Sequence, residues 1–77
     1  MKALTEYIAK SLVDNPDEVA VDEIHRSGHV ILELHVSKDD MGRIIGKGGR
    51  VANAIRTLLR VAAERDGSQV TLDVVEP

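Results

Sequence analysis

The segment Gly42–Arg50 holds the residue types and spacings best suited to chemistry, because four glycines and three basic side chains lie within nine residues. Such loops often bind nucleotide phosphates. A Walker A motif reads G-x-x-x-x-G-K-[ST], but three residues separate Gly42 from Gly46, and Gly48 stands where the motif needs a hydroxyl. A dinucleotide-binding fingerprint starting at Gly46 would need glycine in place of Val51 and would follow a strand. Neither motif is present.

The same spacing favours a turn between two helices that contacts a nucleic-acid backbone. Glycines lack Cβ atoms, so a phosphate can approach the main chain closely. The helix expected after the loop would present its positive dipole end to that phosphate, and Lys47 and Arg50 add two positive charges. The neighbouring Ile44, Ile45 and Val51 would form an apolar floor for the bases. The plainer alternative is a helix–loop–helix turn without a ligand.

The charge distribution sets this loop apart from the rest of the chain. The net charge is −3, yet residues 41–63 contain five basic side chains and no acidic one. Residues 1–40 contain four basic and nine acidic side chains, and residues 64–77 contain one basic and four acidic side chains. A basic segment can be only a solvated helix face, with Arg60 paired to Glu64 one helical turn later. The glycine loop inside the segment favours an anionic partner instead.

Composition excludes several other classes of protein. Tyr7 is the one aromatic residue, which excludes modules that stack bases on exposed rings, such as RRM and cold-shock domains. The absence of cysteine excludes disulfides, thiolate zinc sites and thiol catalysis. No apolar run reaches the length of a signal peptide or a membrane span. With 77 residues, 43% of them apolar, we expect one soluble, cytoplasmic domain over residues 1–77.

Two further groups of polar side chains could carry chemistry. His29, Glu33 and His35 lie at even spacing on one face of an expected strand and could in principle share a metal ion. Without a further ligand, a solvent-facing sheet surface is the better interpretation, so we predict no metal ion and no other cofactor. Asp39 and Asp40 are interpreted as helix capping, because no nucleophile or second carboxylate cluster accompanies them. The sequence therefore predicts a binding protein and not an enzyme.

Hydrophobic periodicity and capping signals predict three helices around the loop. The first spans residues 3–13 and ends before Asn15-Pro16. A second, short helix begins near Lys38, because Ser37-Lys38-Asp39-Asp40 has the pattern of a capping box. The third spans residues 50–65, which places the loop between two helices. The expected buried faces are Leu4, Ile8 and Leu12 in the first helix, and Val51, Ile55, Leu58, Leu59 and Ala62 in the third.

Alternating apolar residues predict three strands. Residues 19–25 alternate imperfectly, which indicates an edge strand or a bulge, and residues 29–36 complete a hairpin around the turn Arg26-Ser27-Gly28. A last strand contains Val70, Leu72 and Val74. The element order is therefore α-β-β-α-α-β, an α+β fold in which three helices are expected to pack on one face of a three-stranded mixed sheet.

The loop and its position between two helices resemble the nucleic-acid-binding core of KH domains. The stretch Ile44-Ile45-Gly46-Lys47-Gly48-Gly49-Arg50, with Ile55 five residues later, looks like their I-G-x-x-G motif, and the element order looks like their type II, bacterial arrangement. The resemblance covers the whole chain and is greatest for small bacterial single-KH RNA-binding proteins of the KhpA type. It implies a type II KH fold that binds about four nucleotides of single-stranded RNA. The candidate RNA-binding residues are Arg43, Ile44, Ile45, Gly46, Lys47, Gly48, Gly49, Arg50, Val51, Asn53 and Ala54.

The resemblance also implies partners. It indicates a cytoplasmic RNA chaperone or post-transcriptional regulator that pairs with a second KH protein (KhpB, also called Jag or EloR) in cell-wall synthesis and cell-shape control. A homodimer is a second expectation, because one short RNA groove gains affinity when it is linked to another. The alternative function is a protein–protein adaptor with little direct RNA binding. Salt dependence of the affinity for RNA distinguishes the two functions.

Overall fold

The computed structural model of the chain describes residues 1–77. Helices and strands follow one another as the sequence predicts, so the α+β class and the α-β-β-α-α-β order are confirmed. Short 3-10 turns precede β1 and α2 and separate α2 from α3. The elements are α1 (Lys2–Leu12), β1 (Ala20–Arg26), β2 (His29–His35), α2 (Met41–Ile45), α3 (Arg50–Arg65) and β3 (Gln69–Val75).

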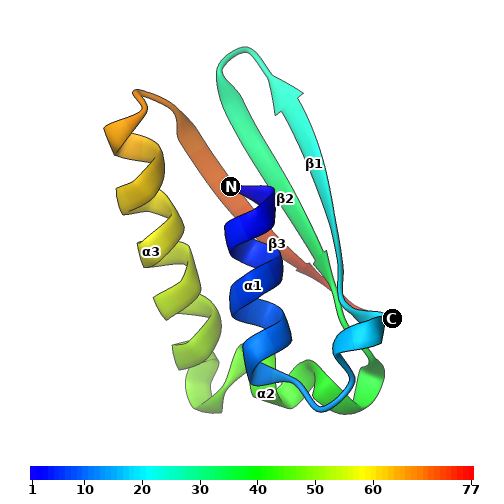
Figure 1. Cartoon of the computed structure of the whole chain (residues 1–77). Helices are drawn as coiled ribbons and strands as arrows, with labels where there is room; N and C mark the ends of the chain where they lie inside the picture. Colours follow the sequence, from blue (N-terminus) through cyan, green and yellow to red (C-terminus); the bar gives the residue numbers. More distant parts are fainter.

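The sheet has the strand order β1-β2-β3 and is mixed, because β1 and β2 are antiparallel whereas β2 and β3 are parallel. Figure 1 shows α1 and α3 side by side on one face of the sheet, with α2 at their lower end. The edge position predicted for β1 is confirmed, and its pairing with β2 runs from Ala20 to Arg26 without a bulge. None of the helices has the length and apolar character needed to cross a lipid bilayer.

The core lies between the helices and the face of the sheet that they cover. Alternate strand residues point toward the helices, and register brings Val21 beside Leu34 and Leu32 beside Leu72, each of them at most 4% exposed. Burial of aliphatic side chains of this size provides most of the folding free energy of a small domain. The core cluster consists of Ala9, Val21, Leu32, Leu34, Val36, Ile44, Ile55, Leu59 and Leu72.

The face that α1 buries differs from the prediction. Thr5 and Ala9 are each 1% exposed, whereas Leu4 and Leu12 remain 39% and 40% exposed. Small side chains let the helix backbone approach its neighbours closely, which turns the larger leucines to the border of the core. The Thr5 hydroxyl donates a hydrogen bond to the carbonyl of Met1 at 2.9 Å, so its burial leaves no unpaired hydroxyl.

The buried face of α3 also differs in part. Ile55 and Leu59 are buried as predicted, but Leu58 is 57% exposed, and Val51 and Ala62 are only half-buried. Small residues complete the buried stripe in their place, because α3 lies close to the sheet. The fully buried residues of the helix are Ala52, Ile55, Leu59 and Ala63.

Asp40 does not act as the helix cap that the sequence predicts, since no side chain caps α2. Its carboxylate is 1% exposed and accepts hydrogen bonds from the backbone N–H groups of Asp14 and Asn15, both at 3.0 Å. The Ser37 hydroxyl and the Asn15 amide also donate to it, at 3.0 and 3.1 Å. Burial alone would raise the pKa of Asp40, but these hydrogen bonds bring it below its ordinary value. Asp40 thus ties the end of α1 to the start of α2.

Candidate nucleic-acid interface

Gly46 ends α2 in a backbone conformation that is accessible almost only to glycine, with φ of 74° and ψ of 169°. Its N–H donates a hydrogen bond to the carbonyl of Gly42 at 2.9 Å, which closes the last turn of α2. A Cβ atom at Gly46 would lie 2.5 Å from Cγ2 of Val51 and 2.9 Å from its backbone nitrogen. Only glycine therefore allows α3 to begin directly beside the end of α2.

The other two glycines of the turn are left-handed and open to solvent on one side. Gly48 and Gly49 have φ of 64° and 82°. A Cβ at Gly48 would meet no atom within 4 Å, whereas one at Gly49 would lie 3.7 Å from Nδ2 of Asn53. Arg50 begins α3 immediately afterwards, and no side chain caps this helix. The turn thus offers bare backbone next to the positive end of a helix dipole, an arrangement suited to an anion.

The basic residues around the turn fall into two groups. Lys47 and Arg50 are exposed and form no ion pair. Arg43, in contrast, lies with Nη2 2.9 Å from Oδ2 of Asp14 and with Nε 3.8 Å from Oδ1 of Asp40. The charge of Arg43 is therefore largely compensated within the protein, and Lys47 and Arg50 are the cations that this turn presents to an anionic ligand.

The apolar candidate residues beside the turn also fall into two groups, buried and partly exposed. Ile44 is 0% exposed and belongs to the core cluster. Its side chain therefore fixes the end of α2 to the core and offers no surface to a ligand. Ile45 and Val51 are half-buried, one at each end of the turn. Asn53 and Ala54 are exposed on the first turns of α3. Accessible apolar surface next to the turn therefore comes from Ile45 and Val51.

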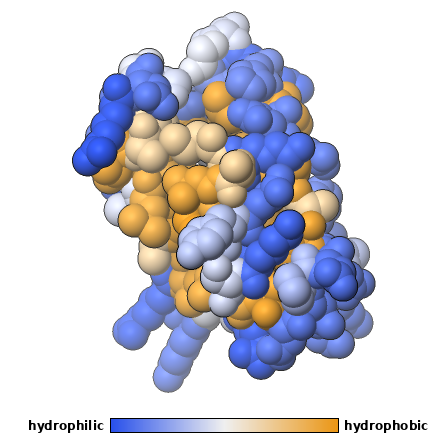
Figure 2. Space-filling view, in the orientation of Figure 1, coloured by the Kyte–Doolittle hydropathy of each residue, from blue (hydrophilic) through white to orange (hydrophobic).

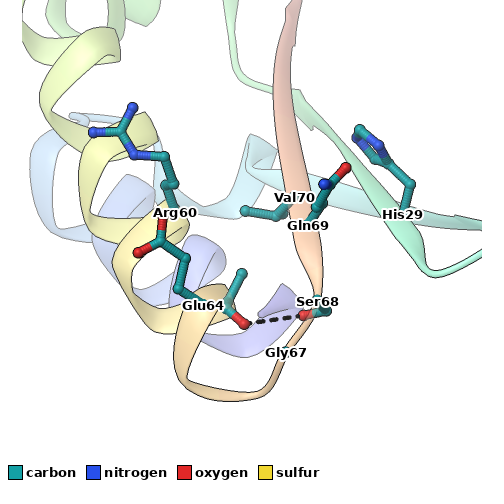
Figure 3. Close-up of a pocket in the computed structure, with 8 residues that line it drawn as sticks. His29, Arg60, Glu64, Gly67, Ser68, Gln69 and Val70 are labelled. Carbon is teal, nitrogen blue, oxygen red and sulfur yellow. Dashed lines mark hydrogen bonds between the residues drawn. The ribbon is translucent and has the colours of Figure 1, made fainter.

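Two hollows of about 510 Å³ and about 220 Å³ lie between α3 and β3, away from the glycine turn. Arg60 of α3 and Val70 of β3 line both, and Figure 3 shows their side chains extending from opposite walls of the larger one. The Ser68 hydroxyl donates a hydrogen bond to the carbonyl of Ala63 at 3.3 Å, which holds the loop between α3 and β3 against the end of α3. Arg60 forms no ion pair with Glu64. Together the hollows define a groove, called here the α3–β3 groove.

The β3 side of this groove is a free sheet edge, because β3 pairs with β2 alone. Arg56 crosses the groove: its Nε donates to the carbonyl of Leu72 at 3.2 Å, and its Nη1 donates to Oδ1 of Asn53 at 3.1 Å. Sequence reasoning left Arg60, Val70 and Leu72 out of the candidate site. The run of arginines on α3 was the available signal, but periodicity does not reveal which strand lies beside a helix.

Known proteins that are similar to this chain agree with the fold and with the glycine turn. The family model described as "KhpA/KhpB, KH domain" matches residues 2–74. The chain is 51% identical over 75 residues to an "RNA-binding protein KhpA" of Clostridium acetobutylicum, covering 97% of this chain and 100% of that protein. It is 49% identical over 76 residues to a protein of the same name from Chlamydia trachomatis, covering 99% and 97%. No solved structure gave a significant match.

The match extends over almost the whole chain, and the fold agrees with it. The mixed three-stranded sheet with three helices is the type II KH arrangement that the sequence resemblance implies. The glycine turn lies between α2 and α3, where the resemblance to the G-x-x-G loop of KH domains implies it. This chain belongs to the KhpA/KhpB family of KH-domain proteins.

Proposed function

We propose that this protein binds single-stranded RNA at the turn Gly46–Gly49 and along the α3–β3 groove. The observation that carries the proposal is the open space at Gly48 between the exposed, unpaired side chains of Lys47 and Arg50. RNA phosphates would cross the turn, where no Cβ atom obstructs them, and the bases would turn toward the groove. The relatives named RNA-binding proteins support the same ligand.

The candidate residues take different roles in this proposal. Lys47, Gly48, Gly49 and Arg50 would contact phosphates. Ile45, Val51, Asn53 and Ala54 would contact bases or sugars. Gly46, Ile44 and Arg43 would hold the turn in shape, the last through its ion pairs with the acidic side chains beside it. Such binding requires no catalytic group and no cofactor at the RNA site, and we propose no enzymatic activity.

The test reverses charge at the turn. Replacing Lys47 and Gly48 together by Asp removes one positive charge, adds two negative ones and places a Cβ in the open space. The affinity for a fluorescent single-stranded RNA should fall at least about tenfold, because like charges now repel the phosphates. A matched control, Lys2→Asp with Ala3→Asp, makes the same charge change at the exposed start of α1 and should alter affinity by less than about twofold.

Circular dichroism and a thermal melt first establish that each variant is folded. A folded turn variant that binds RNA as tightly as the parent would refute the proposed site. Where the double aspartate variant does not fold, Lys47→Ala with Arg50→Ala removes the two charges without a new Cβ at a glycine and serves the same purpose. Loss of RNA binding with protein–protein binding intact supports RNA binding over the adaptor alternative.

The proposal includes assembly into a dimer, with a second copy or with a KhpB-type (Jag/EloR) KH protein. What supports it is apolar surface on the helical layer: Leu4 and Leu12 on α1 are 39% and 40% exposed, and Leu58 and Val61 on α3 are 57% and 48% exposed. Figure 2 shows apolar side chains gathered on this face of the molecule. Apolar surface gathered on one face of a small monomer is typical of an association surface. Two linked RNA grooves would raise affinity through effective concentration.

Leu58→Glu tests the dimer. Its side chain is more than half exposed, so the fold should survive, whereas a buried carboxylate in an interface is strongly unfavourable. Sedimentation of the parent at micromolar concentration should show a dimer, either alone or after addition of the KhpB-type protein, and Leu58→Glu should sediment as a monomer in both cases. The neighbouring Thr57→Glu is the control and should leave assembly unchanged. A parent that remains monomeric throughout would contradict this part of the proposal.

The cellular role we propose is that of a cytoplasmic RNA chaperone or post-transcriptional regulator, acting with its KH partner in cell-wall synthesis and cell-shape control. Support comes from the resemblance to the KhpA type and from the family that covers both KhpA and KhpB. A pull-down from lysate with and without nuclease tests it. The expected result is RNA in the nuclease-free sample and a KH protein in both samples.

A further inference from the structure

The face of the sheet opposite the helices carries a cluster of metal-binding side chains. Register pairs Asp22 of β1 with Glu33 of β2 and Ala20 with His35, so Asp22, Glu33 and His35 share this open face. One ligand atom from each of the three lies within 4.8 Å of the other two. Asp73 of β3 is the register neighbour of Glu33 on its other side. The three clustered side chains come from two strands, β1 and β2, and lie apart from the glycine turn and the α3–β3 groove.

The imidazole of His35 is the unusual member of this cluster. Its side chain is 40% exposed, but its Nε2 atom is buried and has no hydrogen-bond partner. Oδ2 of Asp22 lies 3.2 Å from Nε2, but in a direction that does not satisfy a ring N–H hydrogen bond. An orphaned buried nitrogen is rare in folded proteins and requires an explanation. Of the two other histidines, His29 has its Nε2 2.6 Å from Oγ1 of Thr71, whereas the side chain of His25 is 70% exposed, so water can reach its ring.

We propose that Asp22, Glu33 and His35 bind a divalent transition-metal ion of the zinc type. One imidazole nitrogen and two carboxylate oxygens suit this class of ion better than magnesium or calcium, which prefer oxygen alone. Metal–ligand distances of about 2.1 Å place tetrahedral ligands about 3.4 Å apart. The side chain of Asp22 is 67% exposed and free to rotate, so it can close the remaining gap. A water molecule would take the open position.

Binding at this place would link β1 to β2. The hairpin strand β1 is an edge strand with one neighbour, so a metal bridge from Asp22 to the two ligands on β2 adds a constraint that the sheet otherwise lacks. A ligand that binds only the folded state raises the melting temperature in proportion to the logarithm of its concentration above Kd. The ion would therefore stabilise the fold from the face opposite the RNA groove without contacting RNA.

The experiment uses the full chain without a histidine tag, metal-stripped with a chelator, and ZnCl₂ as the probe. Isothermal titration should give one site per chain with Kd in the micromolar range, and EDTA should reverse a rise in melting temperature. In ¹H–¹⁵N spectra, the largest shifts should fall on Asp22, Glu33 and His35. His35→Gln should weaken binding at least about tenfold, as removal of one ligand does. His25→Gln is the matched control, because it removes a histidine that faces a single carboxylate, and it should bind as the parent does.

Three results would overturn the proposal: no binding of ZnCl₂ up to 500 µM (roughly the range of weak protein sites), shifts centred elsewhere, or equal affinity of parent and His35→Gln. Where His35→Gln does not fold, Asp22→Asn removes a ligand at an exposed position and decides the same question. RNA affinity should be the same with and without zinc, so a failure here leaves the proposed RNA site untouched.

Discussion

Replacing Gly46 by Ala should destabilise the domain by about 3 kcal/mol. The backbone at Gly46, with φ of 74° and ψ of 169°, lies in a region that an alanine occupies only with strain of about 1–3 kcal/mol. The new Cβ would also lie 2.9 Å from the backbone nitrogen of Val51, so the start of α3 must move. Overpacking of this kind costs about 1–3 kcal/mol. Alanine restricts the unfolded chain and offsets about 0.4–1 kcal/mol of that sum.

Gly48→Ala is the matched control for this prediction. Gly48 is also left-handed, with φ of 64° and ψ of 17°, but its Cβ would meet no atom within 4 Å. Only the conformational term applies, and that term is about 1 kcal/mol for a single left-handed residue. Comparing the two variants therefore separates the cost particular to position 46, which comes from its ψ of 169° and the contact with Val51, from the general cost of positive φ.

Thermal unfolding followed by circular dichroism at 222 nm measures both variants. In a domain of this size each kcal/mol shifts Tm by about 4–8 °C, so Gly46→Ala should lower Tm by about 12–24 °C and Gly48→Ala by about 4–8 °C. Urea unfolding supplies the free energies independently. Stabilities of the two variants that agree within about 0.5 kcal/mol would refute the reasoning that the backbone conformation of Gly46 and its contact with Val51 make glycine necessary at position 46.

Three other predictions follow from single contacts. Asp40→Asn should lower Tm at pH 7 by about 5 °C or more. The lowered pKa of Asp40 adds stability only where the carboxyl is ionised in the folded state, so the difference in Tm from the parent should shrink as pH falls below about 4. The exposed Asp39→Asn should match the parent at every pH. Lys47→Ala should weaken all RNA sequences alike and reduce the slope of log K against log salt by less than about 0.7, and a salt-independent parent affinity would contradict phosphate binding. Arg56→Ala should reduce stability by about 1 kcal/mol in urea unfolding, through loss of the hydrogen bond to the carbonyl of Leu72, and an unchanged midpoint would show that this bond contributes nothing.

The amino-acid sequence by itself determined the features that depend on neighbouring residues. The element order follows from apolar spacing within each segment, and α3 runs from Arg50 to Arg65 as predicted. The glycine turn is local as well, because glycine is the residue type that adopts the positive φ of Gly46, Gly48 and Gly49 without steric cost. For the same reason the family resemblance was visible in one short stretch of sequence.

The tertiary structure alone decided which surfaces meet. Periodicity predicted that Leu58 is buried, but the packing of α3 against the sheet uses Ala52 and Ala63 instead. Asp40 was predicted to cap its own helix and instead binds the backbone of residues 14 and 15. Arg43 is compensated by an aspartate 29 positions earlier in the chain, Asp14.

Strand register likewise lies beyond what one segment encodes. The sequence places three side chains on one strand face: His29, Glu33 and His35. In the structure, pairing with β1 brings Asp22 beside Glu33 and His35. His29 instead lies beside Thr71 of β3. The α3–β3 groove has the same origin, since its two walls meet only when β3 adds to β2 in parallel. Each of these contacts joins segments that become neighbours only when the whole core is buried. Periodicity within a single segment does not show which other segment will be its neighbour.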